Sequence, residues 1–123
     1  MQTSQALTPD RFGEQDLEQL SKILKILSEP NRLALFNQIM SGVQCNCELG
    51  DSLSMAPNLV SHHLSVLCES GLVTSKRDED DHRWIYYSIE RKALNAFRER
   101  MGSFFDEDRI QPCTSVCGPK SKR

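Results

Sequence analysis

The sequence predicts a mostly α-helical domain with a β-hairpin wing, arranged as a winged helix-turn-helix. Three observations carry this prediction. Apolar residues recur at helical spacing in several segments, prolines stand where two of these segments begin, and two segments rich in β-branched and aromatic residues follow them. The expected order is helix, helix, short helix, helix, hairpin, helix. A chain of 123 residues is long enough for one core and too short for two.

The first two helices are predicted from their apolar periodicity. One amphipathic helix is expected over Asp16–Leu27, which carries Leu17, Leu20, Leu24 and Leu27 on one stripe. Pro30 then restarts a helix, because proline is tolerated only in a first turn. Leu33, Phe36 and Met40 continue the period, and Gly42 is the expected end.

A helix-turn-helix is predicted next, from a short helix over about 45–53 and a longer one from Pro57 to about Ser70. The inward stripe of the longer helix holds Val60, His63, Leu64 and Leu67, so His63 is expected to be a core histidine. Its outward side carries short polar side chains suited to base edges and phosphates. The candidate DNA contacts on this side are Asn58, Ser61, His62 and Ser65.

The segments 72–77 and 83–89 are predicted to pair as a hairpin around the polar segment 78–82. Three basic residues flank this wing, and they could neutralise DNA phosphates or pair with the acidic residues between them. They are Lys76, Arg77 and Arg83. A last helix is expected from about Glu90 to Phe105.

The predicted domain organisation has three parts. Residues 1–13 are expected to form a flexible N-terminal arm, residues 14–105 the DNA-binding and dimerisation domain, and residues 106–123 a flexible tail that contains cysteines. The apolar stripes of the first and last helices are wider than one small core can cover, which predicts a homodimer. A symmetric dimer would present two copies of the helix that begins at Pro57, one to each half of a two-fold symmetric operator.

Charge and composition exclude several classes of protein. A net charge of −2 gives no global sign of nucleic-acid binding, so any DNA-binding charge must be local. The start has no signal-peptide pattern and no apolar run reaches about 18 residues, which predicts a cytoplasmic protein without a membrane segment. No nucleophile with a base and an orienting group is visible, so an enzyme is not expected.

Five cysteines in a reducing compartment argue against a structural disulfide framework and leave metal binding, redox sensing or burial. Cys45 and Cys47 would point about 200° apart in a regular helix, so joint coordination requires the helix to start late or unwind. Cys113 and Cys117 lie in the tail, and the chain from Phe105 to Cys113 could span about 26 Å. Cys68, beside the inward stripe, is expected to be a small buried hydrophobe.

Four stretches resemble the ArsR/SmtB family of metal-responsive repressors. They are Leu27–Leu33, Leu59–Leu67, Glu69–Val73 and Arg83–Ser88. The segment Cys45-Asn46-Cys47-Glu48-Leu49 is similar to the Cys-x-Cys-Asp/Glu-Leu motif of the arsenic-type and cadmium/lead-type sensors. The zinc and nickel type places histidine on the last helix, and residues 90–105 contain none. One arsenic subtype has a third cysteine where this chain has Gly50.

The resemblance implies a dimeric repressor that binds operator DNA when metal-free and dissociates when an inducer binds. Soft thiolates favour thiophilic ions, so As(III) or Sb(III) is the expected inducer, bound by Cys45 and Cys47 with Cys113 or Cys117. Two alternatives stay open: a Cd(II) or Pb(II) sensor that uses all four thiolates, and a redox sensor in which Cys45 or Cys47 forms a disulfide with the tail.

Overall fold

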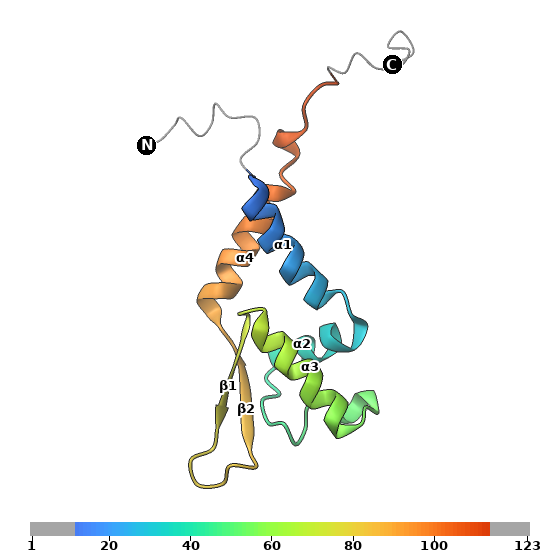
Figure 1. Ribbon diagram of the computed structural model, residues 1–123, viewed down its shortest axis with the longest axis vertical. Coiled ribbons are helices and arrows are strands. Elements are labelled where there is room, and N and C mark those ends of the chain that lie inside the picture. The colour runs from blue at the N-terminus through green and yellow to red at the C-terminus, as the bar shows by residue number, and fades with distance from the viewer. Residues whose placement is uncertain (1–11, 114–123) are drawn as a thin grey trace.

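The computed structural model describes residues 12–113 and confirms the predicted fold class, with four α-helices and a two-stranded antiparallel hairpin (Figure 1). In chain order the elements are α1 (Glu14–Leu27), α2 (Pro30–Met40), the 3-10 helix η2 (Asp51–Leu53), α3 (Pro57–Glu69), β1 (Val73–Arg77), β2 (Ile85–Ile89), α4 (Arg91–Phe104) and the 3-10 helix η3 (Glu107–Arg109).

Local sequence signals set the helix boundaries. Pro30 and Pro57 occupy the first position of α2 and α3, where the missing N–H of proline costs no helical hydrogen bond. The Glu29 side chain caps α2 by accepting a hydrogen bond from the backbone nitrogen of Arg32 at 2.9 Å. Gly71 follows α3 with φ +84°, a left-handed conformation that glycine adopts at little cost.

The predicted short helix over 45–53 is the main local difference. The backbone nitrogen of Leu49 donates to the carbonyl of Cys45 at 3.1 Å, which forms a single helical turn. That turn does not continue, because Gly50 takes the left-handed conformation at φ +88°. The chain then makes only the three-residue η2 before α3 begins.

The cysteine-bearing segment pairs with the wing through an isolated β-bridge. Strands β1 and β2 pair from Val73 opposite Ile89 to Arg77 opposite Ile85. On the other side of β2, Cys45 forms an isolated antiparallel bridge with Tyr86. Two backbone hydrogen bonds hold this bridge, from Tyr87 to Gln44 at 2.8 Å and from Asn46 to Ile85 at 2.9 Å. The segment is therefore fixed to the base of the wing.

The core lies where α2, α3 and the hairpin meet. Its buried members are Leu35, Ile39, Leu49, Val60, Leu64, Leu67, Leu72, Val73 and Tyr87. These residues come from α2, α3, the hairpin and the cysteine-bearing segment. One core therefore fixes the positions of all these elements relative to one another. Burial of these apolar side chains stabilises the domain by removing them from water.

The start of α1 and the end of α4 meet at the end of the molecule opposite the wing (Figure 1). An ion pair joins Asp16 of α1 to Arg100 of α4, and the Arg100 guanidinium lowers the pKa of the Asp16 carboxyl. α4 buries none of its side chains fully. Leu17 of α1 and Phe105, which follows α4, stay 43% and 68% exposed, so this end of the described residues carries uncovered apolar surface.

Residues just after α4 pack instead of leaving the domain at once. The Arg109 guanidinium of η3 lies 4.7 Å from the ring centre of Phe12 and 5.0 Å from that of Phe104. The two rings meet edge to face with centres 5.4 Å apart. Both ends of the described chain are thus tied to the α1–α4 end.

None of the helices within residues 12–113 is long and apolar enough to cross a membrane.

Candidate functional site

The outward side of α3 presents the polar residues that the sequence predicts as DNA contacts. Asn58, Ser61, His62 and Ser65 are all exposed. The predicted inward stripe is confirmed, since Val60, His63, Leu64 and Leu67 are buried. α3 can therefore offer one continuous face of short polar side chains to a groove of DNA.

His63 is a core histidine with a partner, as its position on the inward stripe predicts. Its Nδ1 lies 3.2 Å from Nη1 of Arg32, and Arg32 also donates from Nε to the carbonyl of Ile26 at 2.7 Å. Because a guanidinium only donates, Nδ1 of His63 is the acceptor and its proton resides on Nε2. Arg32 in this way links the end of α1 to the buried side of α3.

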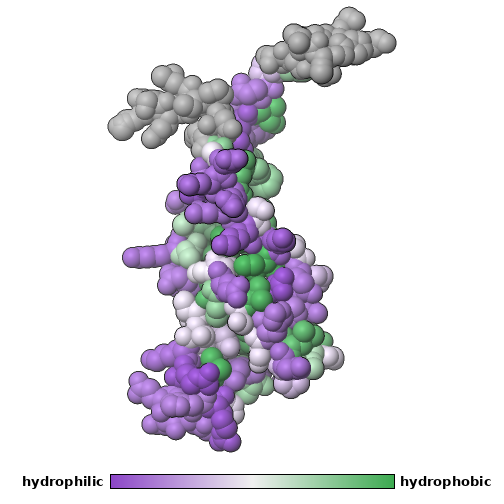
Figure 2. Space-filling model, viewed as in Figure 1, coloured by the Kyte–Doolittle hydropathy of each residue, from purple (hydrophilic) through white to green (hydrophobic). Residues whose placement is uncertain are grey.

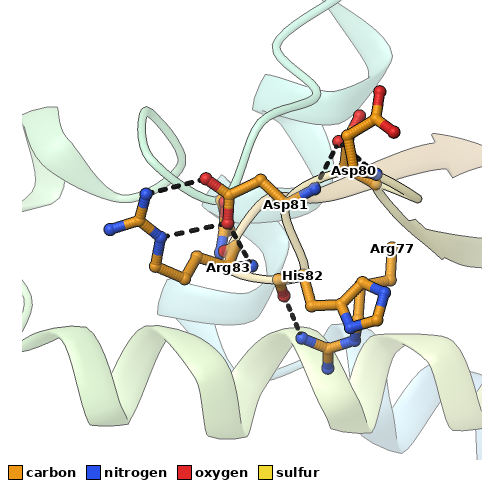
Figure 3. A network of polar contacts seen from close by, with 7 residues as sticks. Arg77, Asp80, Asp81, His82 and Arg83 are labelled. Atoms are coloured by element: carbon orange, nitrogen blue, oxygen red, sulfur yellow. Dashed lines mark hydrogen bonds and ion pairs between the residues drawn. The ribbon is translucent and has the colours of Figure 1, made fainter.

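The two arginines of the wing make contacts within the wing tip (Figure 3). Arg83 donates from Nε and Nη2 to the two carboxylate oxygens of Asp81 at 3.0 and 2.7 Å. This pairing lowers the pKa of the Asp81 carboxyl. Arg77 donates to the carbonyl oxygen of His82.

Lys76 lies on the exposed side of β1, opposite Tyr86 of β2. Hydrophilic residues dominate the surface of the wing tip at the lower end of the molecule (Figure 2). The acidic residues 78–81 belong to this tip, and Asp78 accepts hydrogen bonds from the backbone of Asp80 and Asp81. The basic residues of the wing therefore lie at the end of β1 and at Arg83.

The structure brings Cys45 and Cys47 together. Cys45 sits in the bridge to β2 and Cys47 in the turn after it, so the pair is outside any regular helix. Their Cα atoms are 5.1 Å apart and their sulfur atoms are joined as a disulfide. A bond between residues two apart closes a very short loop and constrains little of the unfolded chain. The bond thus links two residues of one turn and does not crosslink distant parts of the fold.

Asn46, between the two cysteines, is a residue that the sequence analysis missed. Its side-chain Nδ2 donates to the carbonyl of Arg83 at 3.1 Å, and its Oδ1 accepts from the backbone nitrogen of Ile85 at 3.3 Å. The Sγ of Cys45 lies 3.6 Å from the same Oδ1. Asparagine tends to bind backbone groups in turns, and this tendency is the signal that could have identified Asn46 from the sequence.

The far end of the same turn is held by α2 and α3. Gln38 of α2 accepts from the backbone nitrogen of Gly50 and donates to the Ser52 hydroxyl, both at 2.9 Å. Gly50 is buried, and a Cβ built on it would lie 2.6 Å from Cγ2 of Val60 on α3. The departure from the Cys-x-Cys-x-x-Cys pattern at this position therefore has a steric cause, because a side chain here collides with α3.

Alanine at position 50 is expected to lower the free energy of unfolding by about 2 to 5 kcal/mol, from a left-handed backbone and a collision with Val60. Gly42 is the matched control, since it has φ +102° and nothing within 4 Å of a built Cβ. Gly42→Ala should lose only the backbone part, about 1 to 2 kcal/mol. Urea unfolding of both variants measures the difference, and equal losses would refute the collision.

The tail cysteine that the structure describes does not join the pair. Cys113 is exposed, and its segment lies past the α1–α4 end, away from the wing (Figure 1). Cys117 lies outside the described residues. Within residues 12–113 no three His, Cys, Asp or Glu residues are grouped to hold a metal ion. Cys68 is half-buried, and burial raises the pKa of its thiol, which suits the predicted packing role.

Comparison with known proteins agrees with this arrangement. Residues 29–75 match the family described as bacterial regulatory protein, arsR family. An arsenical resistance operon repressor of Staphylococcus aureus is 35% identical over 99 residues, which is 80% of this chain and 92% of that protein. The cadmium resistance transcriptional regulatory protein CadC of Listeria innocua is 30% identical over 95 residues, 76% of each chain.

A solved structure extends the similarity to three dimensions. The crystal structure of a possible transcriptional regulator for arsenical resistance superposes with a TM-score of 0.60 and is 31% identical. The match covers 72% of this chain and 88% of that one. The likeness therefore extends over most of the described chain.

Proposed function

Because this chain belongs to the arsR family of bacterial regulatory proteins, we propose that it is a metalloid-responsive transcriptional repressor. It binds operator DNA as a homodimer, and arsenite or antimonite releases it by binding the thiolates of Cys45 and Cys47. The family is one of DNA-binding regulators and not of enzymes. The closeness of the two sulfur atoms, in a segment that pairs with the wing and packs against α3 at Gly50, is the observation that carries the proposal.

The chemistry of the pair favours a soft ligand. Reduction of the Cys45–Cys47 disulfide would leave two sulfur donors within one turn, where the backbone N–H of Cys47 donates to the Sγ of Cys45 at 3.2 Å. A donor aimed at sulfur stabilises negative charge there, and thiolates select thiophilic ions. Arsenite takes three thiolates, so the proposal requires one more, from Cys113 or Cys117.

A homodimer is proposed from the uncovered apolar surface of α1 and the segment after α4. Leu24 and Ile110 remain 40% and 79% exposed, in addition to Leu17 and Phe105. Apolar surface of this kind is buried in a subunit interface. Two copies would present two α3 faces, with Asn58, Ser61, His62 and Ser65 to bases and Lys76, Arg77 and Arg83 to phosphates.

The test is an anaerobic titration of the fully reduced protein on a labelled operator, with arsenite, antimonite and cadmium in separate arms. Arsenite or antimonite is expected to weaken operator binding by a factor of about 5 to 150. X-ray absorption at the arsenic edge should then count three sulfur ligands. Operator binding that persists at saturating arsenite contradicts the proposal.

The cadmium arm of that titration and a further arm with peroxide test the two alternatives. The similarity to a cadmium resistance regulator supports a Cd(II) or Pb(II) sensor, which would respond to cadmium with four sulfur ligands. A redox sensor, in which Cys45 or Cys47 forms a disulfide with the tail, would release DNA with peroxide alone and recover with a dithiol reductant.

A further inference from the structure

We propose that Asn46 couples the dithiol to the wing, so that ligand capture by Cys45 and Cys47 acts on DNA binding through the wing as well as through α3. This inference rests on the proposed function. It makes Asn46 a positioning residue, because its side chain contacts the wing and not the ligand.

Asn46 directly connects the cysteine pair to the wing. Its backbone nitrogen donates to the carbonyl of Ile85 and its side chain bonds Arg83 and Ile85, so one residue makes three hydrogen bonds to the wing. The two cysteines flank it directly in the chain. A ligand held by both sulfurs fixes the backbone on each side of Asn46, and its side chain must follow.

The part of the wing that bonds to Asn46 includes a candidate DNA contact. Arg83, whose carbonyl accepts from Asn46, pairs its guanidinium with Asp81 and is a candidate phosphate contact. The neighbouring Trp84 accepts a hydrogen bond from the backbone of Asp78 at 2.8 Å, across the hairpin. When Asn46 shifts, the base of the wing tip shifts with it.

The opposite end of the turn provides the matched control. Gln38 anchors Gly50 and Ser52 to α2 with two side-chain hydrogen bonds, and neither bond involves the wing. Gln38→Ala therefore removes two hydrogen bonds at the α2 end of the turn, and Asn46→Ala removes two at its wing end together with the contact from Cys45 Sγ. A merely structural role predicts the same effect of both changes on induction.

The experiment measures operator affinity of the reduced full-length protein with and without arsenite. In Asn46→Ala the arsenite effect is expected to fall below about twofold, from at least about fivefold in the unchanged protein, while thiol titration still shows arsenite bound. Gln38→Ala should keep the full effect. Asn46→Asp, which retains the acceptor and loses the donor, should give an intermediate effect.

A second readout is independent of DNA. Trp84 is the single tryptophan of the chain, and arsenite should change its fluorescence in the unchanged protein and in Gln38→Ala, but not in Asn46→Ala. Full release and an unchanged fluorescence response in Asn46→Ala, or equal loss in both variants, overturn the inference alone. If the unchanged protein keeps its operator in arsenite, the proposed function fails and the inference falls with it.

Discussion

Serine in place of Cys45 or Cys47 is expected to abolish arsenite-induced release of operator DNA and to leave binding of the metal-free protein within about twofold. A hydroxyl does not replace a thiolate as a soft ligand, so either change removes one of the two donors that the structure brings together. The arsenite effect, about 5- to 150-fold for typical coupling between two sites, should fall to none. Mobility shift of a labelled operator against increasing arsenite measures it.

Cys68→Ser is the control for this prediction. It removes a half-buried thiol that belongs to α3 and is distant in sequence from the pair, and the release by arsenite should persist. Serine variants of Cys45 and Cys47 that still respond fully would rule out these residues as the inducer site. A variant that loses operator binding without arsenite would instead reveal a structural role.

Replacement of both Ser61 and His62 by alanine is expected to weaken operator binding by roughly 10- to 1,000-fold, since each good base contact contributes about 1 to 3 kcal/mol of discrimination. Both side chains are exposed on the outward side of α3, so their removal should leave the core and the unfolding free energy almost unchanged. Fluorescence anisotropy on operator and on unrelated DNA of equal length distinguishes the kind of contact. A loss confined to operator indicates base contacts, and an equal loss on both indicates phosphate contacts.

Gln19→Ala, an exposed polar position on α1, controls for general surface effects and should bind operator normally. Operator affinity that stays the same in the double variant would reject the assignment of this face. The same measurement on Lys76→Ala should show a uniform loss and a salt dependence weaker by about one counterion.

Much of the fold could be predicted because its signals are local. The prolines at 30 and 57 and the stops near Gly42 and Gly71 mark helix ends that the structure shares. The 45–53 segment was harder to predict, because its helical turn is stopped by Gly50, whose conformation depends on packing against Val60 of α3. Such a contact joins residues distant in sequence, and periodicity does not reveal it.

The candidate site divides in the same way. The outward and inward residues of α3 follow from helical spacing, and the structure exposes and buries them as predicted. The role of Asn46 depends on a bridge between Cys45 and Tyr86, two residues far apart in the chain. The pairing of Arg83 with Asp81 is one of the two roles that the sequence left open for the basic residues of the wing, and the role of Arg83 toward DNA stays a prediction.

Because Arg109 packs on Phe12 and Phe104, the tether, meaning the segment between the last packed residue and Cys113, is shorter than the sequence predicts. The last anchored residue is Arg109 rather than Phe105, so the arm to Cys113 has four residues and a reach of about 13 Å instead of 26 Å. A short tether raises the effective concentration of its thiol at sites within reach and reduces it to almost nothing elsewhere. Lengthening the tether after Arg109 should therefore change arsenite affinity more than any change in the tail's charge.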